Sequence, residues 1–279
     1  MTKWSFRFAL ALLLFSISGT VQAADFTPPR LPDGHPDMQG LWYKFAGEGF
    51  DPLYVGLLNG APVGGGGGRG GGGRGAAPAG APGATGFLRP GVPVLPYLPA
   101  AAALRKERLE HHMFDDPEAH CHIPGVPRGT EQPPYPFQII QDEKYFTILY
   151  EAMHDVRIIP TDRSPHPKNY RAWDGDSRGH WEGDTFVVDV SNFNGRTWLD
   201  MDANFVDENE HVVERYTLVD RDTIAYQATV TDPTVFSQSW TMNLTLKRRG
   251  KEDQIIEYSC LEGERDLQHY TDKEGRNAK

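Results

Sequence analysis

The sequence predicts an all-β domain, an antiparallel meander of about eight or nine strands that closes into a barrel. From residue 137 onward, short segments rich in β-branched and aromatic residues follow one another at close spacing. Several of them alternate apolar and polar residues with period two, as half-buried strands do. No helical crossover separates them, so neighbouring segments are expected to pair antiparallel. Closing such a sheet into a barrel removes its exposed edges.

The elements are expected in a simple order after a long irregular N-terminal segment. Residues 101–113 contain good helix formers without a breaker and predict one short helix. Prolines between residues 117 and 136 then prevent regular structure. Polar turns, such as Asp142-Glu143-Lys144, separate the strands that follow. The strands are predicted at residues 137–141, 145–150, 156–160, 179–182, 185–190, 211–219, 223–231, 239–247 and 254–260.

The chain of 279 residues is expected to have four parts. They are a signal peptide, a Pro-rich N-terminal segment, a flexible Gly/Ala/Pro-rich insertion and the barrel domain, at residues 1–23, 24–59, 60–100 and 101–279. Lys3 and Arg7 precede a short apolar run, and Val21-Gln22-Ala23 offers small residues for cleavage. The Gly-rich composition cannot bury a core. We therefore expect an exported protein, periplasmic or extracellular, with no membrane attachment after signal cleavage.

Composition excludes several functions. The chain carries 38 acidic and 28 basic residues, a net charge of −10. An acidic chain is a poor general ligand for nucleic acid, so we expect no nucleic-acid partner. The sequence has no Walker loop, no G-x-G-x-x-G before a helix, no G-x-S-x-G and no H-E-x-x-H. These absences argue against nucleotide-dependent chemistry and the commonest hydrolases, and we expect no cofactor. The oligomeric state is left open.

Cys121 and Cys260 are the only cysteines of the chain. In an oxidising compartment they are expected to form a disulfide rather than two free thiols. The bond would close a loop of about 140 residues and contribute roughly 4–5 kcal/mol through chain entropy. A nucleophilic cysteine is disfavoured, because the residues before Cys260 would not lower its pKa.

Gly40-Leu41-Trp42 precedes the predicted meander. This G-x-W arrangement resembles the start of lipocalin-like (calycin) barrels. The resemblance implies a lipocalin-like barrel in which Trp42 plugs one end. It also implies that Trp42 packs on an arginine from a late strand, either Arg248 or Arg249.

Further motifs are spread over most of residues 30–262. They are Leu31-Pro32-Asp33-Gly34, PDxxGxW at 36–42, residues 121–128, HDVRxI at 154–159, WEGDT at 181–185 and ERY at 214–216. Together they resemble an uncharacterised family of exported bacterial proteins. The resemblance implies export, and it implies no activity.

Polar residues are densest between Glu151 and Trp181, where they are expected to line a barrel mouth. A neutral histidine beside a carboxylate can act as a general base, and an arginine can hold a carboxylate or an oxyanion. The alternative is a solvated loop with ion pairs. The catalytic candidates are His154, Asp155, Arg157 and His166. The ligand-binding candidates are Arg178, His180, Trp181, Tyr216, Tyr226 and Trp240, of which the tyrosines and Trp240 could equally be core residues.

His120 and His122 offer the H-x-H spacing of a metal site, which His111, His112 or Asp115 could complete. No third ligand stands at a characteristic spacing, and Cys121 is assigned to the disulfide. We therefore expect no metal.

Three functions are compatible with these features. The first is an exported β-barrel that binds a small, partly apolar molecule at a His/Arg/Asp-lined mouth. The second is a cofactor-independent lyase, isomerase or hydrolase, in which His154 or His166 moves a proton and Arg157 stabilises charge. The third is a non-enzymatic envelope interaction module that uses the N-terminal segment and the Gly-rich arm. The compact polar cluster favours the first two.

Overall fold

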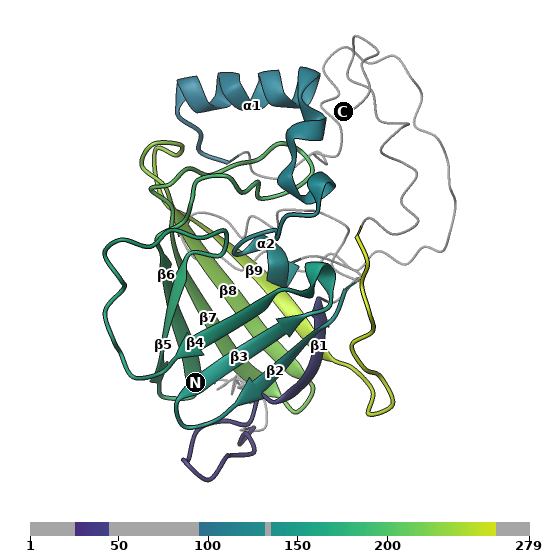
Figure 1. Ribbon diagram of the computed structural model, residues 1–279. Helices are drawn as coiled ribbons and strands as arrows, with labels where there is room; N and C mark the ends of the chain where they lie inside the picture. Colours follow the sequence, from purple (N-terminus) through teal and green to yellow (C-terminus); the bar gives the residue numbers. More distant parts are fainter. Residues whose placement is uncertain (1–25, 45–94, 132–134, 261–279) are drawn as a thin grey trace, which may run out of the picture.

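The computed structural model describes residues 26–44, 95–131 and 135–260 (Figure 1). Nine strands form one sheet in the order β4-β3-β2-β1-β9-β8-β7-β6-β5, and every ladder in it is antiparallel. The sheet curls into a nearly closed barrel (Figure 1). The predicted all-β class, the antiparallel meander and the barrel are thus confirmed.

The bounds of the elements agree closely with the sequence patterns. The strands are β1 Gly40–Lys44, β2 Phe137–Gln141, β3 Tyr145–Tyr150, β4 Val156–Pro160, β5 Asp176–Glu182, β6 Thr185–Ser191, β7 His211–Asp220, β8 Thr223–Thr231 and β9 Trp240–Arg248. The α-helices are α1 Pro99–His111 and α2 Arg128–Glu131, and the 3-10 helices are η2 Met113–Asp115, η3 Pro117–His120 and η4 Ala152–His154. Helix α1 therefore begins two residues before the range predicted from the sequence, inside the predicted insertion at 60–100, of which Leu95 is also buried. The prediction of no regular structure between residues 117 and 136 is wrong, because η3 and α2 lie there.

The last predicted strand, at residues 254–260, is wrong: these residues belong to no strand. β1 takes the place beside β9 that a further strand would need. Trp42 of β1 lies opposite both Phe137 of β2 and Arg248 of β9. The barrel thus draws a strand from the Pro-rich segment, outside the range 101–279 predicted for it. Of the predicted signal peptide and insertion, residues 1–23 and 60–94 lie outside the described residues.

The barrel closes between β4 and β5, the two ends of the sheet, and we call this contact the seam. Neighbouring strands of an antiparallel sheet run in opposite directions. β4 and β5 are the first and the ninth strand of the sheet, so they run in the same direction. Arg157 of β4 donates from Nη2 to Ser177 Oγ of β5 at 2.9 Å. A Cβ at Gly179 would lie 2.4 Å from Phe186 Cζ and 3.0 Å from Ile159 Cγ2. Glycine therefore permits the close approach of β4 to β5.

The interior of the barrel is filled by large side chains. Trp42, Phe137, Phe146, Phe186 and Trp240 are all at most 1% exposed. Phe146 stacks on Phe186 with ring centroids 4.2 Å apart. Packed aromatic side chains dominate the energetics of such a core. A ligand is therefore expected at an end of the barrel and not along its axis.

Residues 26–39 cover one end of the barrel (Figure 1). Arg30 forms two hydrogen bonds with the Asp184 carboxylate, at 2.9 and 3.0 Å, and Met38 is fully buried. The guanidinium of Arg248 lies 4.1 Å from the Trp42 ring centroid, which confirms the predicted contact with a late-strand arginine. The lipocalin-like resemblance itself stays a prediction. Because residues 26–44 are packed on the barrel, they are not a free arm for a partner.

The opposite end, where β2, β4, β5, β7 and β9 begin, is the capped end. Helix α1 and the segments that follow it lie over this end (Figure 1). Lys44 Nζ and Glu131 Oε1 form a buried ion pair at 2.6 Å, and Arg128 forms a bidentate pair with Asp116 at 2.8 Å. These pairs join α2 to β1 and to the N-cap of η3.

The predicted disulfide between Cys121 and Cys260 is confirmed, with the two Cα atoms 5.8 Å apart. It fixes residues 254–260 against the capped end. Ile256 N donates to Glu151 Oε2, and Tyr258 N donates to His154 Nε2, each at 3.0 Å. Within the part of the chain that the structure describes, no helix combines the length and apolarity needed to cross a membrane.

Candidate functional site

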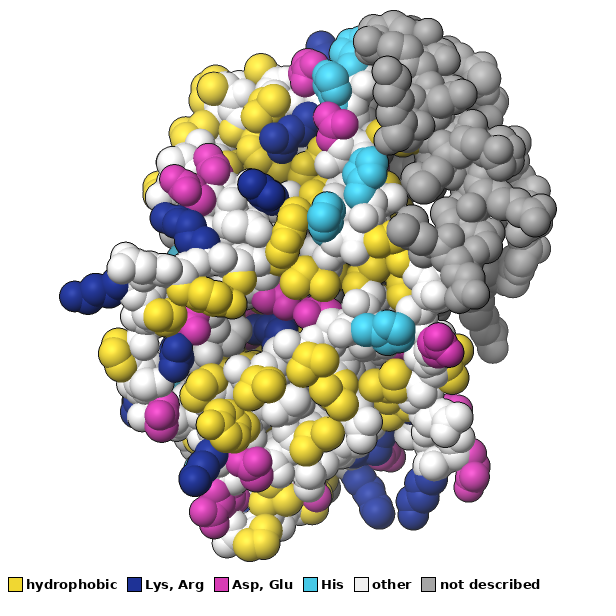
Figure 2. All heavy atoms as spheres, in the orientation of Figure 1, with side chains coloured by type: hydrophobic (Ala, Val, Ile, Leu, Met, Phe, Trp, Pro, Cys, Tyr) yellow, Lys and Arg dark blue, Asp and Glu magenta, His cyan; other side chains and the backbone are white. Residues whose placement is uncertain are grey.

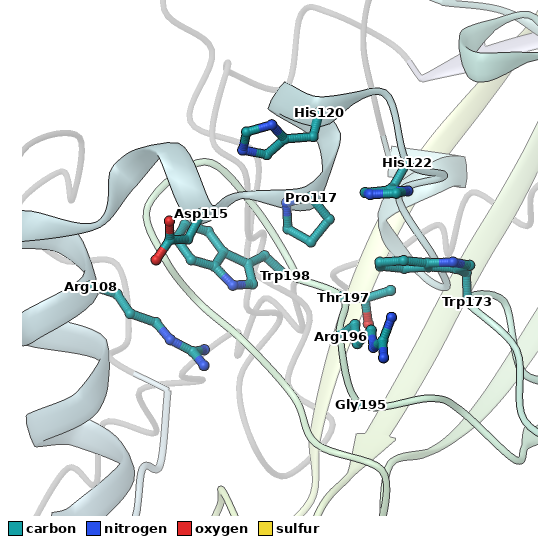
Figure 3. A pocket seen from close by; sticks show the side chains of 10 residues that line it. All are labelled: Arg108, Asp115, Pro117, His120, His122, Trp173, Gly195, Arg196, Thr197 and Trp198. Atoms are coloured by element: carbon teal, nitrogen blue, oxygen red, sulfur yellow. The ribbon is translucent and has the colours of Figure 1, made fainter. Parts of the chain in front are cut away.

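A pocket of about 490 Å³ opens at the capped end, between the α1–η3 segment and the loop before β7 (Figure 3). Its walls come from three regions of the sequence that the barrel and its cap bring together. The lining residues are Arg108, Asp115, Pro117, His120, His122, Trp173, Gly195, Arg196, Thr197 and Trp198.

Aromatic rings form the walls of this pocket. His122 stacks on Trp173 with centroids 4.7 Å apart and planes at 14°. The Arg108 guanidinium lies 4.4 Å from the Phe205 centroid and 5.7 Å from that of Trp198. Figure 3 shows Arg108 extending from α1 towards the pocket, with Trp173 and Arg196 on the far side. The pocket therefore offers flat apolar surfaces as well as cations.

The two arginines of the pocket form no direct ion pair with a described carboxylate, although the charges of Asp115, Glu107 and Asp207 act on Arg108. Neither Arg108 nor Arg196 forms an ion pair with a described residue. The carboxylate of Asp115 is already paired with His112 Nδ1 at 3.2 Å. Burial lowers the pKa of Arg108, opposed chiefly by Asp115, and the guanidinium remains a cation at neutral pH. Thr197 Oγ1 is buried and has no hydrogen-bond partner among the described residues.

A second polar cluster lies at the capped end of the seam. Arg157 donates to both carboxylate oxygens of Glu214, at 3.2 and 2.5 Å, and both side chains are buried. Tyr216 OH and Tyr226 OH each donate to Glu214 Oε1 at 2.9 Å. Burial alone would lower the pKa of Arg157, but Glu214 raises it overall. The Glu214 carboxylate thus accepts hydrogen bonds from Arg157 and from both tyrosines.

Two carboxyl groups meet beside this ion pair. The side chain of Asp174, in the turn before β5, hydrogen-bonds that of Asp155, the residue before β4. Asp155 Oδ1 also accepts from Val156 N at 2.8 Å, whereas Asp174 Oδ1 is buried without a described partner. Burial, and then the Asp155 charge, raise the pKa of Asp174 well above its usual range.

The residues predicted from the sequence do not all converge. Asp155 and Arg157 lie together at the seam. His154 accepts from the backbone of Tyr258, and Tyr216, Tyr226 and Trp240 are buried in the packed interior. Trp181 stacks with His35 and packs against the core. These side chains therefore form no common mouth.

Three further candidates lie on the outer face of β5 and β6. His166 bonds Asp176 from Nδ1 at 2.6 Å and Asp189 from Nε2 at 2.8 Å. Arg178 is paired with Asp176, and His180 with Glu182. This face is a network of ion pairs, which is the alternative that the sequence left open.

The outer network gives a pH-dependent prediction. His211 Nε2 lies 3.1 Å from Asp189 Oδ2, and this hydrogen bond raises the pKa of His211 above 6.5 and lowers that of Asp189. The contribution of His211 is complete below its unfolded pKa and is lost as pH rises through its folded pKa. We therefore expect His211→Asn to lower the melting temperature at pH about 5 and hardly at pH about 9. Equal losses in thermal melts at both pH values would contradict this.

The two histidines considered as metal ligands make different contacts. His120 Nε2 hydrogen-bonds Phe114 O at 2.5 Å, and His122 stacks on Trp173. In residues 26–44, 95–131 and 135–260, no three His, Cys, Asp or Glu side chains are grouped to hold a metal ion.

Sequence reasoning missed Arg108, Trp173, Asp174, Trp198 and Glu214. Arg108 lies in a helix whose pattern shows only good helix formers. Asp174 belongs to the dense polar stretch, which was the one signal for it. The others become site residues only through contacts with distant segments. Comparison of the chain with protein-family models, with curated proteins and with solved structures gives no match.

Proposed function

We propose that this protein binds a small, partly apolar organic anion in the pocket at the capped end. The observation that carries the proposal is that two arginines and two tryptophans line the same pocket. The arginines, Arg108 and Arg196, form no ion pair with a described residue, and the tryptophans are Trp173 and Trp198. A carboxylate or sulfonate would meet the guanidinium groups, since arginine presents donors that match such planar anions. A flat apolar body would lie against the tryptophans.

The dimensions and charge of the pocket support this ligand class. A volume of about 490 Å³ suits a small organic molecule and not a macromolecular segment. The protein as a whole carries a net charge of −10, so the pocket is a local positive site on an acidic molecule. A long polyanion would be repelled by the surrounding surface, whereas a small anion would enter the pocket alone.

We also propose that the protein acts after export, in an oxidising compartment. The disulfide between Cys121 and Cys260 supports this location, because such bonds persist where thiols are not kept reduced. The signal peptide predicted at residues 1–23 and the resemblance to exported bacterial proteins are in keeping with this proposal. Detection of the protein in the periplasmic or extracellular fraction, with its first residues removed, would test the location.

Binding can be tested with a matched pair of probes. A naphthalene carboxylate is expected to bind more tightly than the neutral naphthalene carboxamide, as measured by calorimetry. Arg108→Met keeps the aliphatic stem but removes the charge-assisted hydrogen bond, so it should weaken carboxylate binding about tenfold or more. Carboxamide binding should change little.

Arg221→Met is the control, because Arg221 is exposed in the β7–β8 turn, at the other end of the barrel. It should leave the affinity for both probes unchanged. Equal affinity of the wild-type protein for the acid and the amide would refute the proposal, and so would wild-type affinity in Arg108→Met.

A further inference from the structure

We propose that the outer face of β2, β3 and β4 is the surface through which this protein forms a symmetric dimer with a second copy of itself. We call this surface the apolar face. It shares no residue with the pocket at the capped end, so the dimer does not depend on the proposed ligand binding. The apolar face consists of the outward residues Gln138, Ile140, Tyr145, Thr147, Leu149, Val156, Ile158 and Pro160.

The outward positions of these three strands carry no charge. Along each strand buried residues alternate with exposed or partly exposed ones, so burial itself identifies the outward set. Val156 and Ile158 are 50% and 61% exposed, and Ile140 and Tyr145 are 41% and 42% exposed. Figure 2 shows hydrophobic side chains gathered over these strands. The apolar face is therefore an exposed surface and not part of the core.

Strand pairing joins the outward side chains into continuous rows. Directly opposed residues on one face of a sheet have Cβ atoms about 5 Å apart, which is close enough for their side chains to touch. The register places Ile140, Thr147 and Ile158 in one row and Gln138, Leu149 and Val156 in the next. The apolar side chains thus form one patch and are not scattered singly.

The other half of the barrel has a different outer face. There, outward side chains of neighbouring strands are hydrogen-bonded in pairs: Thr185 with Thr217, Gln227 with Asn243, and Thr229 with Thr241. Within the described part of the chain, no such bond links side chains across the apolar face. Contiguous exposed apolar surface of this kind marks a site of interaction.

The size of the apolar face suits the centre of a dimer interface. Its strands are five or six residues long. Three such strands, about 4.8 Å apart, cover roughly 300 Å². A stable interface buries about 800 Å² of each partner and has an apolar centre surrounded by a polar rim. The apolar face supplies such a centre, and the charged residues around it supply the rim.

Charges at one end of the apolar face favour a second copy as the partner. Glu143 and Lys144 belong to the β2–β3 turn, and Asp162 and Arg163 follow β4 beside it, since Thr161 N donates to Lys144 O at 2.9 Å. Glu143, Lys144 and Arg163 are exposed and form no ion pair with a described residue. Each side of β3 thus ends in one acid and one base. A second copy presents the same mixed set.

A two-fold axis along β3 makes this surface complementary to itself. Such an axis lies between the two copies and places β2 of each copy over β4 of the other. Ile140 of each copy then packs against Ile158 of the other, as in sheets that pack face to face. The β2–β3 turn of each copy lies over residues 161–163 of the other, so acid can meet base at the rim. No charges meet at the centre, although each copy carries a net charge of −10.

The test is the oligomeric state of the purified full chain, measured by sedimentation equilibrium. The wild-type protein should pass from monomer to dimer between about 1 and 100 μM. Ile158→Lys should raise the dissociation constant of the dimer about a hundredfold or more, because it places two uncompensated charges at the centre of the interface. This variant should fold, since the Ile158 side chain is in solvent in the monomer.

Val219→Lys is the matched control. Val219 is also an exposed aliphatic residue, at 47%, but it belongs to β7 in the other half of the barrel. The substitution adds the same charge as Ile158→Lys. It should leave the dissociation constant of the dimer unchanged.

Two further measurements test the position of the axis. The double variant Ile140→Lys/Ile158→Glu should dimerise more tightly than either single variant, because opposite charges then face one another between the copies. In the wild-type protein, a carbodiimide should join Lys144 of one copy to Asp162 of the other. Mass mapping of a mixture of labelled and unlabelled chains distinguishes this bond from one within a single copy, and it requires no variant.

A wild-type protein that remains monomeric at about 100 μM would overturn the proposal. A dimer that Ile158→Lys leaves intact would overturn it equally. A monomer that floats with phosphatidylcholine vesicles, and ceases to do so as Ile158→Lys, would assign the apolar face to a lipid surface in place of a second copy. None of these results alters the affinities expected for the naphthalene probes at the capped end.

Discussion

Replacing Glu214 with glutamine is expected to destabilise the protein by about 3–5 kcal/mol, because it leaves the Arg157 guanidinium charged and buried without its counter-ion. Glu214 is 0% exposed and Arg157 is 4% exposed, so water cannot replace the lost carboxylate. Glutamine retains an oxygen that can accept from Tyr216 and Tyr226. The loss therefore reports the charge and not these hydrogen bonds. Urea unfolding measures it as a fall in the free energy of unfolding.

Glu182→Gln provides the matched control for this substitution. Glu182 Oε2 lies 2.9 Å from Arg215 Nη2, but the side chains are 48% and 37% exposed. Exposed ion pairs contribute about 1 kcal/mol or less. Adding Arg157→Met to Glu214→Gln should recover much of the stability, since no buried charge is then left. A loss in Glu214→Gln no larger than that in Glu182→Gln would contradict the prediction.

Removing the disulfide is expected to cost roughly 4–5 kcal/mol in the double variant Cys121→Ser/Cys260→Ser. The bond joins residues separated by 139 positions, so its loss greatly enlarges the freedom of the unfolded chain. In the folded protein it also holds residues 254–260, whose backbone donates to Glu151 and His154. Loss of the bond is expected to free this segment.

Reduced wild-type protein is the reference for this experiment and should unfold at the same urea concentration as the double variant. Hydrogen exchange should increase at Ile256 N and Tyr258 N and remain slow within β7 and β8. A change below about 1 kcal/mol would show that the unfolded chain gains little from losing the bond.

The strands were predictable because burial on one face of a sheet produces an alternating pattern of apolar and polar residues in the sequence. Ile224, Tyr226, Ala228 and Val230 alternate with more polar residues, and all four are buried in β8. β1 left no such record, because its five residues follow a Pro-rich stretch and pair only with distant strands. Residues 254–260 form no strand, because both edges of β9 are already paired, one with β1 and the other with β8.

The candidate sites were less accessible to sequence reasoning than the strands. Arg157 and Asp155 stood out as polar residues at a strand start, and both lie at the seam. Arg178 stood out equally, yet it faces outward, because alternate residues of a strand point to opposite sides of the sheet. His166 also stood out, but it lies in the loop before β5 and bonds Asp176 and Asp189 on that outer face. Nothing in the sequence around Arg108 indicated a binding role, because its role depends on residues from distant segments that line the same pocket.

By itself, the sequence determined the all-β class, most strand positions, a helix at residues 101–113 that overlaps α1, and the pairing of two cysteines. These depend on local periodicity, local propensity and the presence of a single possible disulfide. The tertiary structure alone decided which polar residues meet. Arg157 reaches Glu214 across 57 positions, and Asp155 reaches Asp174 because an odd number of strands brings β4 and β5 together in parallel. Periodicity records whether a side chain faces inward, but only closure of the barrel determines its neighbour there.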